Sequence, residues 1–148
     1  MPDLLEKNPD IRLLLVGDGP LKSDLENLCK DLKVSDQVIF LGNSDRVNEL
    51  LMAADVFLFP SKREGLGISA IEAQASGLVR LLSTNVPRDT GISERARFIA
   101  LDKDKWTYEI LYYKGSIRKN VIEDIRRKGY DIETSVKKLS NIYLHLLK

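Results

Sequence analysis

Two glutamates frame a glycine-rich stretch near the middle of this 148-residue chain. Glu64 comes directly before Gly65-Leu66-Gly67, and Glu72 follows eight positions after Glu64. Glycines just before a helix leave backbone N–H groups open, and the helix dipole favours a phosphate at that end. Carboxylates accept strong hydrogen bonds from the hydroxyl groups of a ribose or a hexose. The stretch therefore predicts a site for a sugar nucleotide, with a solvated loop and helix surface as the alternative.

Basic residues near this stretch have two interpretations each. Lys62 and Arg63 precede Glu64, where they contact the phosphates of a ligand or form a solvated loop. Arg80 stands in a predicted strand. Either its aliphatic stem packs while its guanidinium reaches solvent or a partner, or its charge lies near the phosphates of a ligand. The residue types alone leave these alternatives open.

Two other enzyme classes fit the same residues less well. Gly17-Asp18-Gly19 could begin the motif of a dinucleotide dehydrogenase, but the third glycine would fall at Lys22 and the next strand ends in Gly42 instead of an acidic residue. A glycosidase could use Glu64 and Glu72 as acid and base, but it would give the glycines no role. We rank both below a sugar-nucleotide site.

The elements that must position these residues alternate between strands and helices. Apolar runs predict strands at 11–16, 37–41, 55–59, 79–82 and 97–101. Helical spacing predicts helices between them, including one at 68–76 that Gly77 ends in a left-handed cap. This order predicts an α/β fold with a Rossmann-like parallel sheet and helices on both faces. In such a sheet ligands bind beyond the carboxyl ends of the strands.

The remaining helices are predicted from spacing and capping. Ser44 can cap a helix that contains Leu50 and Leu51. The chain is predicted to be helical from about residue 103, with helices at 116–128 and from about 131. One helix after the first strand carries four leucines at helical spacing, which predicts a buried stripe: Leu21, Leu25, Leu28 and Leu32. The whole chain, 1–148, is expected to be one domain.

Composition excludes several classes of protein. The chain has 23 Lys and Arg against 22 Asp and Glu, a balance that argues against a general nucleic-acid binder. One cysteine, Cys29, and one histidine, His145, exclude an internal disulfide and a Cys or His metal cluster. The apolar runs are far shorter than a bilayer span, and the first residues contain no signal-peptide core. We therefore expect a soluble domain of a reducing compartment.

Several of these segments, in this order, resemble the donor-binding half of the family-4 glycosyltransferases, which have the GT-B fold. The family's Glu-(seven residues)-Glu motif is matched by Glu64 and Glu72, and its Gly-aromatic-Gly stretch appears as Gly65-Leu66-Gly67, with a leucine at the aromatic position. Residues 54–61 (ADVFLFPS) and 13–20 (LLLVGDGP) are also typical of that half. The tail at 129–143 is similar to those of capsule and exopolysaccharide enzymes.

The resemblance implies a role for each candidate residue. Glu72 would bind the ribose, and Glu64 would contact the donor sugar and is the candidate catalytic residue. The amides from Gly65 through Leu66 and Gly67 to Ile68 would face the sugar and the diphosphate. Gly17 would leave room beside the nucleotide. Gly42 and Asn43 would hold the base, mostly through main-chain groups. Lys62 and Arg63 would bring positive charge near the phosphates.

The reaction that the resemblance implies is retaining transfer of a hexosyl group from a nucleotide-diphosphate sugar, with a UDP-sugar first among donors, to an acceptor hydroxyl. The setting would be capsular or exopolysaccharide synthesis in the cytoplasm, with a glycan or lipid-linked acceptor and peripheral membrane contact of the full-length protein. No metal, cofactor or nucleic acid is expected. The alternative is a non-catalytic nucleotide-binding or regulatory module of the same fold.

The chain departs from the family pattern in two respects. Members usually begin this half with a strand that ends in Gly-Arg, with a lysine nearby, and nothing before Ile11 matches that pattern. We also expect the N-terminal acceptor domain to be absent from this chain, and the isolated chain to be inactive. The family's Gly-Leu-Pro-Val reads Gly77-Leu78-Val79-Arg80 here, so an arginine enters a predicted strand.

Overall fold

A computed structural model describes residues 1–146, and the chain forms two compact units, Met1–Leu50 and Leu51–Lys148. The first unit contains α1 (Pro2–Lys7), β1 (Leu13–Val16), α2 (Lys22–Asp31), a 3₁₀ turn (Ser35–Gln37) and β2 (Val38–Gly42). The boundary between the units falls within α3 (Val47–Ala53). The second unit contains β3 (Val56–Phe59), α4 (Ile68–Ala75), β4 (Val79–Ser83), β5 (Ala96–Ile99), α5 (Lys103–Tyr113), α6 (Ile122–Arg127) and α7 (Ile132–Leu146).

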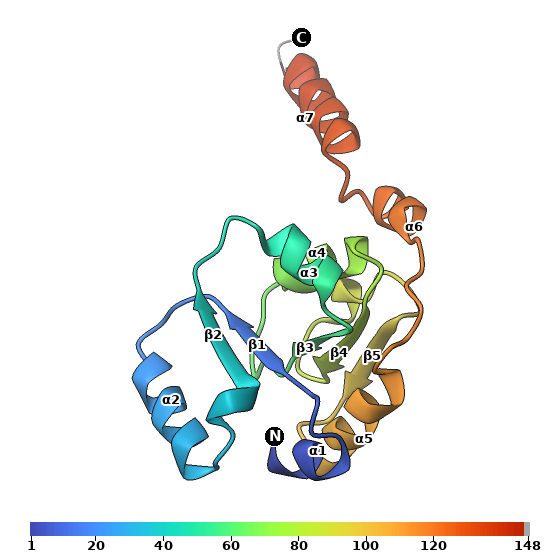
Figure 1. Ribbon diagram of the computed structural model, residues 1–148. Coiled ribbons are helices and arrows are strands. Elements are labelled where there is room, and N and C mark those ends of the chain that lie inside the picture. The colour runs from blue at the N-terminus through green and yellow to red at the C-terminus, as the bar shows by residue number, and fades with distance from the viewer. Residues whose placement is uncertain (147–148) are drawn as a thin grey trace. The chain divides into compact units, whose positions relative to one another are not determined.

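The parallel α/β fold is confirmed, and its strands divide into two sheets. In one, β1 pairs parallel with β2, with Leu13 opposite Val38. In the other, β3, β4 and β5 lie in sequence order and all pairs are parallel (Figure 1). The helix α4 connects β3 to β4, and a connection with the 3₁₀ turn Arg88–Thr90 joins β4 to β5, so each strand pairs with the next one along the chain.

Helices cover both faces of the β3–β5 sheet. On one face Ala70 of α4 packs with Leu82 and with Phe57 and Phe59 of β3. On the other, Val79 and Leu81 pack with aromatic and aliphatic side chains of α5, namely Trp106, Ile110 and Tyr113. All five residues of β4 are buried as a result.

The leucine stripe of α2 is not buried, contrary to the prediction. Leu21, Leu25, Leu28 and Leu32 are each at least 43% exposed, and α2 has no buried residue. The helical spacing is correct, because α2 forms where it was predicted. The first unit has only two strands, and such a sheet is too narrow to cover a four-leucine stripe.

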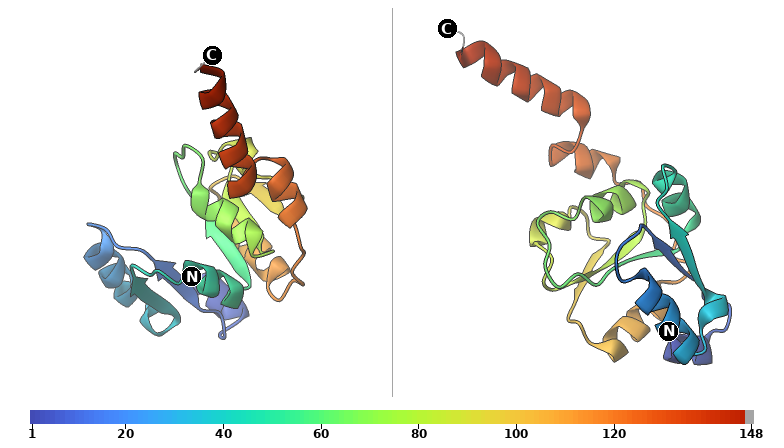
Figure 2. Two further views of the ribbon diagram at one scale, coloured as in Figure 1. Left: turned by 90° about the horizontal axis from the view of Figure 1, so that it is seen from above. Right: turned by 90° about the vertical axis from the view of Figure 1, so that its left-hand side faces the viewer.

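The chain after β5 also differs from the prediction in part. Asp102 caps α5 by accepting a hydrogen bond from the Lys105 amide at 2.9 Å. The helix expected from residue 116 begins only at Ile122, and Ile117 is 88% exposed. Figures 1 and 2 show the non-helical connection between α5 and α6, and α7 extending beyond α6 with no buried residue.

Two further features complete the fold. The helix α1 was not predicted, since the first ten residues of the chain lack a helical apolar stripe, yet Leu4 is buried. No helix within residues 1–146 is both long enough and apolar enough to span a bilayer.

Candidate functional site

The loop between β3 and α4 lies at the carboxyl end of β3, where a ligand is expected in a parallel sheet. Pro60 follows the last residue of β3 directly. Ser83, the last residue of β4, donates a very short hydrogen bond from Oγ to the carbonyl of Ser61. Ser61 Oγ in turn donates to the carbonyl of Arg63 at 2.7 Å. The start of the loop is therefore tied to the neighbouring strand.

Gly67 makes the turn from the loop into α4. It caps α4 in the left-handed region, with φ 72° and ψ 59°, which favours glycine. A Cβ atom at this position would lie 3.0 Å from the Phe59 ring. Both the backbone angle and the aromatic neighbour from β3 explain why glycine stands here.

The first amides of α4 are open to a ligand. The Gly67 carbonyl accepts the amides of Ala70 and Ile71, at 2.9 and 3.3 Å. The amides of Ile68 and Ser69 come before this first hydrogen-bonded turn and have no partner within the helix. Unpaired N–H groups and the positive end of the helix dipole together favour an anion at this position.

Both candidate glutamates are exposed near this helix end. Glu64 Oε1 accepts the amide of Gly65 at 3.2 Å. Glu72 is the fifth residue of α4, between the buried Ile71 and Ala73. A residue at that position shares a helix face with Ile68, one turn earlier. Glu64 thus lies in the loop before the open amides, and Glu72 lies one helical turn after them.

The rest of the loop is held by Thr90, at the end of the connection 83–90 that follows the fourth predicted strand. Thr90, buried in the 3₁₀ turn Arg88–Thr90, donates from Oγ1 to the carbonyl of Leu66 at 2.6 Å. Lys62 and Arg63 are exposed, which leaves their ammonium and guanidinium groups in solvent. Ser83 and Thr90 bound the connection after a predicted strand, which is one of the segments where a ligand is expected, but their hydrogen bonds to the β3–α4 loop were not predicted.

The other candidates belong to the first unit. Gly17 follows β1 and Gly42 is the last residue of β2, and the Gly17 amide donates to the Gly42 carbonyl at 2.7 Å. Both have positive φ values, 122° and 75°, which only glycine adopts easily. Asn43 is the next residue, so the structure brings these three together at the carboxyl end of the β1–β2 sheet.

Arg80 lies away from the ligand edge of its sheet. It is the second residue of β4, and three residues of strand, about 10 Å, separate it from Ser83 at the carboxyl end. Its side chain is fully buried and donates to the Leu78 carbonyl and to Ser93 Oγ, both at 3.1 Å. Burial, and secondarily the charge of Arg95, lowers the pKa of Arg80 to about 10. The packed interpretation of Arg80 therefore fits, and the phosphate interpretation does not.

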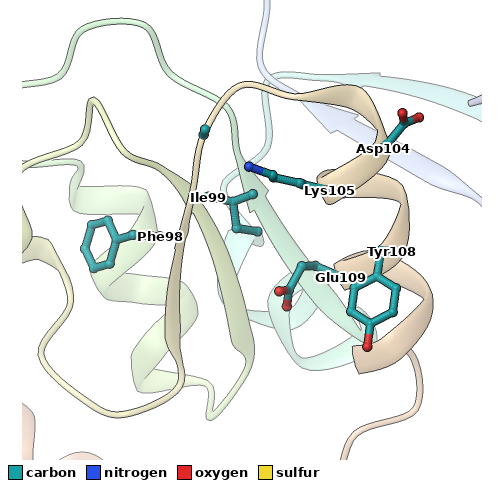
Figure 3. A pocket seen from close by; sticks show the side chains of 7 residues that line it. Phe98, Ile99, Asp104, Lys105, Tyr108 and Glu109 are labelled. Atoms are coloured by element: carbon teal, nitrogen blue, oxygen red, sulfur yellow. The ribbon is translucent and has the colours of Figure 1, made fainter.

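A pocket of about 400 Å³ lies between the end of β5 and α5 (Figure 3). The side chain of Lys105 extends across it toward Ile99, and Glu109 lies 3.9 Å from Arg97. None of the predicted site residues lines it. Within residues 1–146, no group of three or more His, Cys, Asp or Glu side chains is placed to hold a metal ion.

Comparisons with known sequences agree with the motifs. The sequence profile of the family described as glycosyl transferases group 1 matches residues 1–93. The glycosyltransferase EpsF of Bacillus subtilis is 32% identical over 146 residues, which cover 95% of this chain and 38% of EpsF. A UDP-Gal:alpha-D-GlcNAc-diphosphoundecaprenol alpha-1,3-galactosyltransferase of Escherichia coli is 36% identical over 83 residues, 54% of this chain and 21% of the relative. The chain thus spans well under half the length of these relatives.

Solved structures show the same fold. Sucrose-phosphate synthase from Thermosynechococcus elongatus superposes with a TM-score of 0.79 at 24% identity, covering 99% of this chain and 41% of that one. The pneumococcal O-GlcNAc transferase GtfA, solved with UDP and GlcNAc, has a TM-score of 0.61 at 22% identity, covering 76% and 23%. The match of the profile to more than half of the residues shows the family: this chain belongs to the group 1 glycosyl transferases, of family 4 and the GT-B fold.

Proposed function

We propose that this chain binds a nucleotide-diphosphate sugar at the β3–α4 turn, as the donor-binding part of a retaining hexosyltransferase. One observation carries the proposal. The left-handed Gly67 opens the amides of Ile68 and Ser69 at the carboxyl end of β3, with the exposed Glu64 before them and the exposed Glu72 after them in the chain. Amide donors for an anion, together with two carboxylates that accept hydrogen bonds from hydroxyl groups, suit a diphosphate that joins two sugars.

The proposed roles follow the order of groups in such a donor. The open amides of α4 would bind the diphosphate, and the helix dipole would offset part of its charge. Glu72 would accept hydrogen bonds from the ribose hydroxyls. Glu64 would accept from hydroxyls of the transferred sugar and orient its anomeric carbon, which makes it the candidate catalytic residue.

Charge near the phosphates would come from side chains. Lys62 and Arg63 are exposed in the loop that leads to Glu64, so they are free to approach a diphosphate. We propose that they and the helix end, instead of a metal ion, stabilise the leaving diphosphate. Within the first unit, we propose that Gly17, Gly42 and Asn43 can contact a nucleotide base through main-chain groups, since a Cβ atom on either glycine would meet no neighbour within 4 Å.

The names of the relatives support a UDP-sugar and an exopolysaccharide or related glycan product. The Escherichia coli relative is named for UDP-Gal and a diphosphoundecaprenol acceptor, and GtfA was solved with UDP and GlcNAc. EpsF is similar along nearly the whole chain. Because the chain covers 38% of EpsF, we propose that the acceptor site lies outside these residues and that this chain alone does not transfer sugar.

A binding screen tests the proposal. The 148-residue chain would be titrated calorimetrically with UDP, GDP and ADP and with UDP-glucose, UDP-galactose and UDP-N-acetylglucosamine. We expect one nucleoside diphosphate to bind and its matching nucleotide sugar to bind as well or better. Absence of binding to every compound would contradict the donor site. Turnover of a nucleotide sugar by the isolated chain with a glycan acceptor would contradict the proposal that the acceptor site lies outside these residues.

A further inference from the structure

Arg118 makes an unusual set of contacts for a residue in a surface connection. It lies between α5 and α6, and its Nη1 donates to the carbonyl of Ser76 at 2.7 Å. Its Nη2 faces three more carbonyls, those of Leu51, Met52 and Ala54, at 3.0, 2.7 and 2.5 Å. One guanidinium group therefore binds four backbone oxygens from two separate parts of the chain.

These carbonyls are the ones that need a donor. Leu51 and Met52 belong to the last turn of α3, and Ser76 is the C-terminal cap of α4. The last carbonyls of a helix have no partner within the helix and carry the negative end of its dipole. A planar guanidinium with a fixed fork of N–H groups can serve two such helix ends at once.

The two anchored ends bracket the donor site. The Ala54 carbonyl lies two residues before β3, and the Ser76 carbonyl lies directly after α4. The segment between them contains β3, the loop with Glu64, and α4 with Glu72. We propose that Arg118 is a positioning residue that fixes the β3–loop–α4 segment for donor binding, an inference that rests on the proposed function.

A backbone contact beside Arg118 supports this role. The Lys119 amide donates to the Gly77 carbonyl at 3.4 Å, and a Cβ on Gly77 would lie 2.6 Å from the Lys119 oxygen. The connection therefore packs so closely on the end of α4 that only glycine fits. The Lys119 amide thus pairs with the chain just after α4 instead of with a neighbouring turn of its own segment.

The mechanism acts along the axis of α4. A helix of eight residues is stiff, so a change at its anchored carboxyl end moves or tilts its amino end, where the open amides lie. Binding sites tolerate displacements of well under an ångström before affinity falls. Arg118 touches no proposed ligand group, so its effect must pass through this segment.

Hydrogen exchange on the 148-residue chain tests the role without any ligand. We expect Arg118→Ala to speed amide exchange in residues 55–76 at least tenfold, while amides of β5 and α5 change less than threefold. The matched control is Arg126→Ala, which removes an exposed arginine paired with Glu123 in α6. Unchanged exchange in 55–76, or equal acceleration throughout the second unit, would overturn the positioning role.

Titration with UDP and UDP-N-acetylglucosamine gives the second readout. Arg118→Ala should weaken both ligands about tenfold, and Arg118→Lys should restore part of the loss because it keeps the charge but not the fork. Equal affinity of Arg118→Ala and the parent chain would overturn the link to donor binding. A parent chain that binds neither ligand would contradict the proposed donor, while the exchange experiment would still decide whether Arg118 holds the segment.

Discussion

The two sheets of this molecule are built from similar apolar runs but reach different degrees of burial. All five residues of β4 are buried, whereas Ile39 and Leu41 of β2 are 46% and 44% exposed. This difference in burial has a structural cause, because the β3–β5 sheet has one more strand and is covered by helices on both faces. Within it β4 has a neighbouring strand on each side, whereas β2 pairs with β1 alone. An apolar run thus predicts a strand, but the number of neighbouring elements decides how far its side chains are buried.

The helices show the same contrast. The short helix α4 buries four of its eight residues, Ala70, Ile71, Ala73 and Gln74. The longer α2 has a regular leucine stripe and no buried residue. Helical periodicity predicted both helices, and only the sheet below each determines whether its apolar face contributes to stability.

Matched leucine substitutions would test this contrast most strongly. Leu81→Ala empties a site that is fully buried between β3, β5 and α5, so it should cost about 2–5 kcal/mol of unfolding free energy. Leu28→Ala, at a position that is 49% exposed, should cost under about 1 kcal/mol. Urea denaturation followed by circular dichroism measures both. Similar losses for the two variants would mean that α2 is covered in solution.

Two glycine substitutions separate backbone strain from packing. Gly77 and Gly129 have similar positive φ values, 73° and 83°. A Cβ on Gly77 meets the Lys119 carbonyl oxygen at 2.6 Å, whereas on Gly129 its nearest neighbour is the Lys138 ammonium at 3.6 Å. Gly77→Ala should cost about 2–4 kcal/mol, from strain and overlap, and Gly129→Ala about 1–2 kcal/mol from strain alone.

Thermal denaturation of these two variants would measure the difference. Equal losses would show that the connection at residues 116–121 yields without cost, and would weaken the case that it anchors α4.

The uncovered helix α7 should depend on its cap. The backbone and side chain of Thr134 hydrogen-bond to Asp131, and these bonds lower the pKa of Asp131 below 3.8. The stabilisation is therefore present above pH 3.8 and is lost as the pH falls through the lower pKa of the folded state. Asp131→Asn, which cannot titrate, should lack the small loss of helix signal in that range. Identical acid titrations by circular dichroism would contradict this.

The smallest effect is expected where a charge lies far from the ligand edge. Arg80→Met should leave the affinity for UDP within about twofold of the parent chain, because Arg80 is buried near the amino end of β4. Arg63→Met, in the exposed loop beside Glu64, should weaken UDP binding several-fold. Calorimetric titration measures both, and a tenfold loss for Arg80→Met would restore the phosphate interpretation of that arginine.

Local patterns predicted the strands, the start of α4 and its glycine cap from sequence. Hydrophobic periodicity and the residues that end strands and helices carry this information, because Pro60, Gly67 and Gly77 restrict or free the backbone at their own positions. The candidate residues came from the same loop and from the resemblance of linked motifs. These are short-range features, and they are readable without knowledge of the tertiary structure.

Long-range contacts were not predictable in the same way. The exposed α2 stripe depends on how many strands lie beneath it, and the extended course around Arg118 depends on carbonyls more than forty residues away. The spacing of Ile117, Val121 and Ile125 favoured a helix there, but the Lys119 amide pairs with Gly77 and the Arg118 side chain with distant carbonyls. The hydrogen bonds of Ser83 and Thr90 to the β3–α4 loop, which join residues 22 and 24 positions apart, were not predictable for the same reason.

Glu72→Gln is the most direct test of the proposed donor site. The variant keeps the shape of the side chain but removes its charge and replaces one acceptor oxygen by a donor. Loss of charge-assisted hydrogen bonds worth about 1.5–3 kcal/mol should weaken nucleoside diphosphate binding about ten- to a hundredfold, with thermal stability unchanged. Glu64→Gln should weaken the nucleotide sugar alone, and Glu133→Gln, on the exposed first turn of α7, should change neither.

Calorimetric titration of the three variants and the parent chain with UDP and with UDP-N-acetylglucosamine decides the matter. A large loss of UDP affinity in Glu72→Gln alone would agree with a ribose held by this carboxylate at the β3–α4 turn. If Glu72→Gln binds UDP as tightly as the parent chain, Glu72 is a solvated helix residue and the nucleotide binds elsewhere.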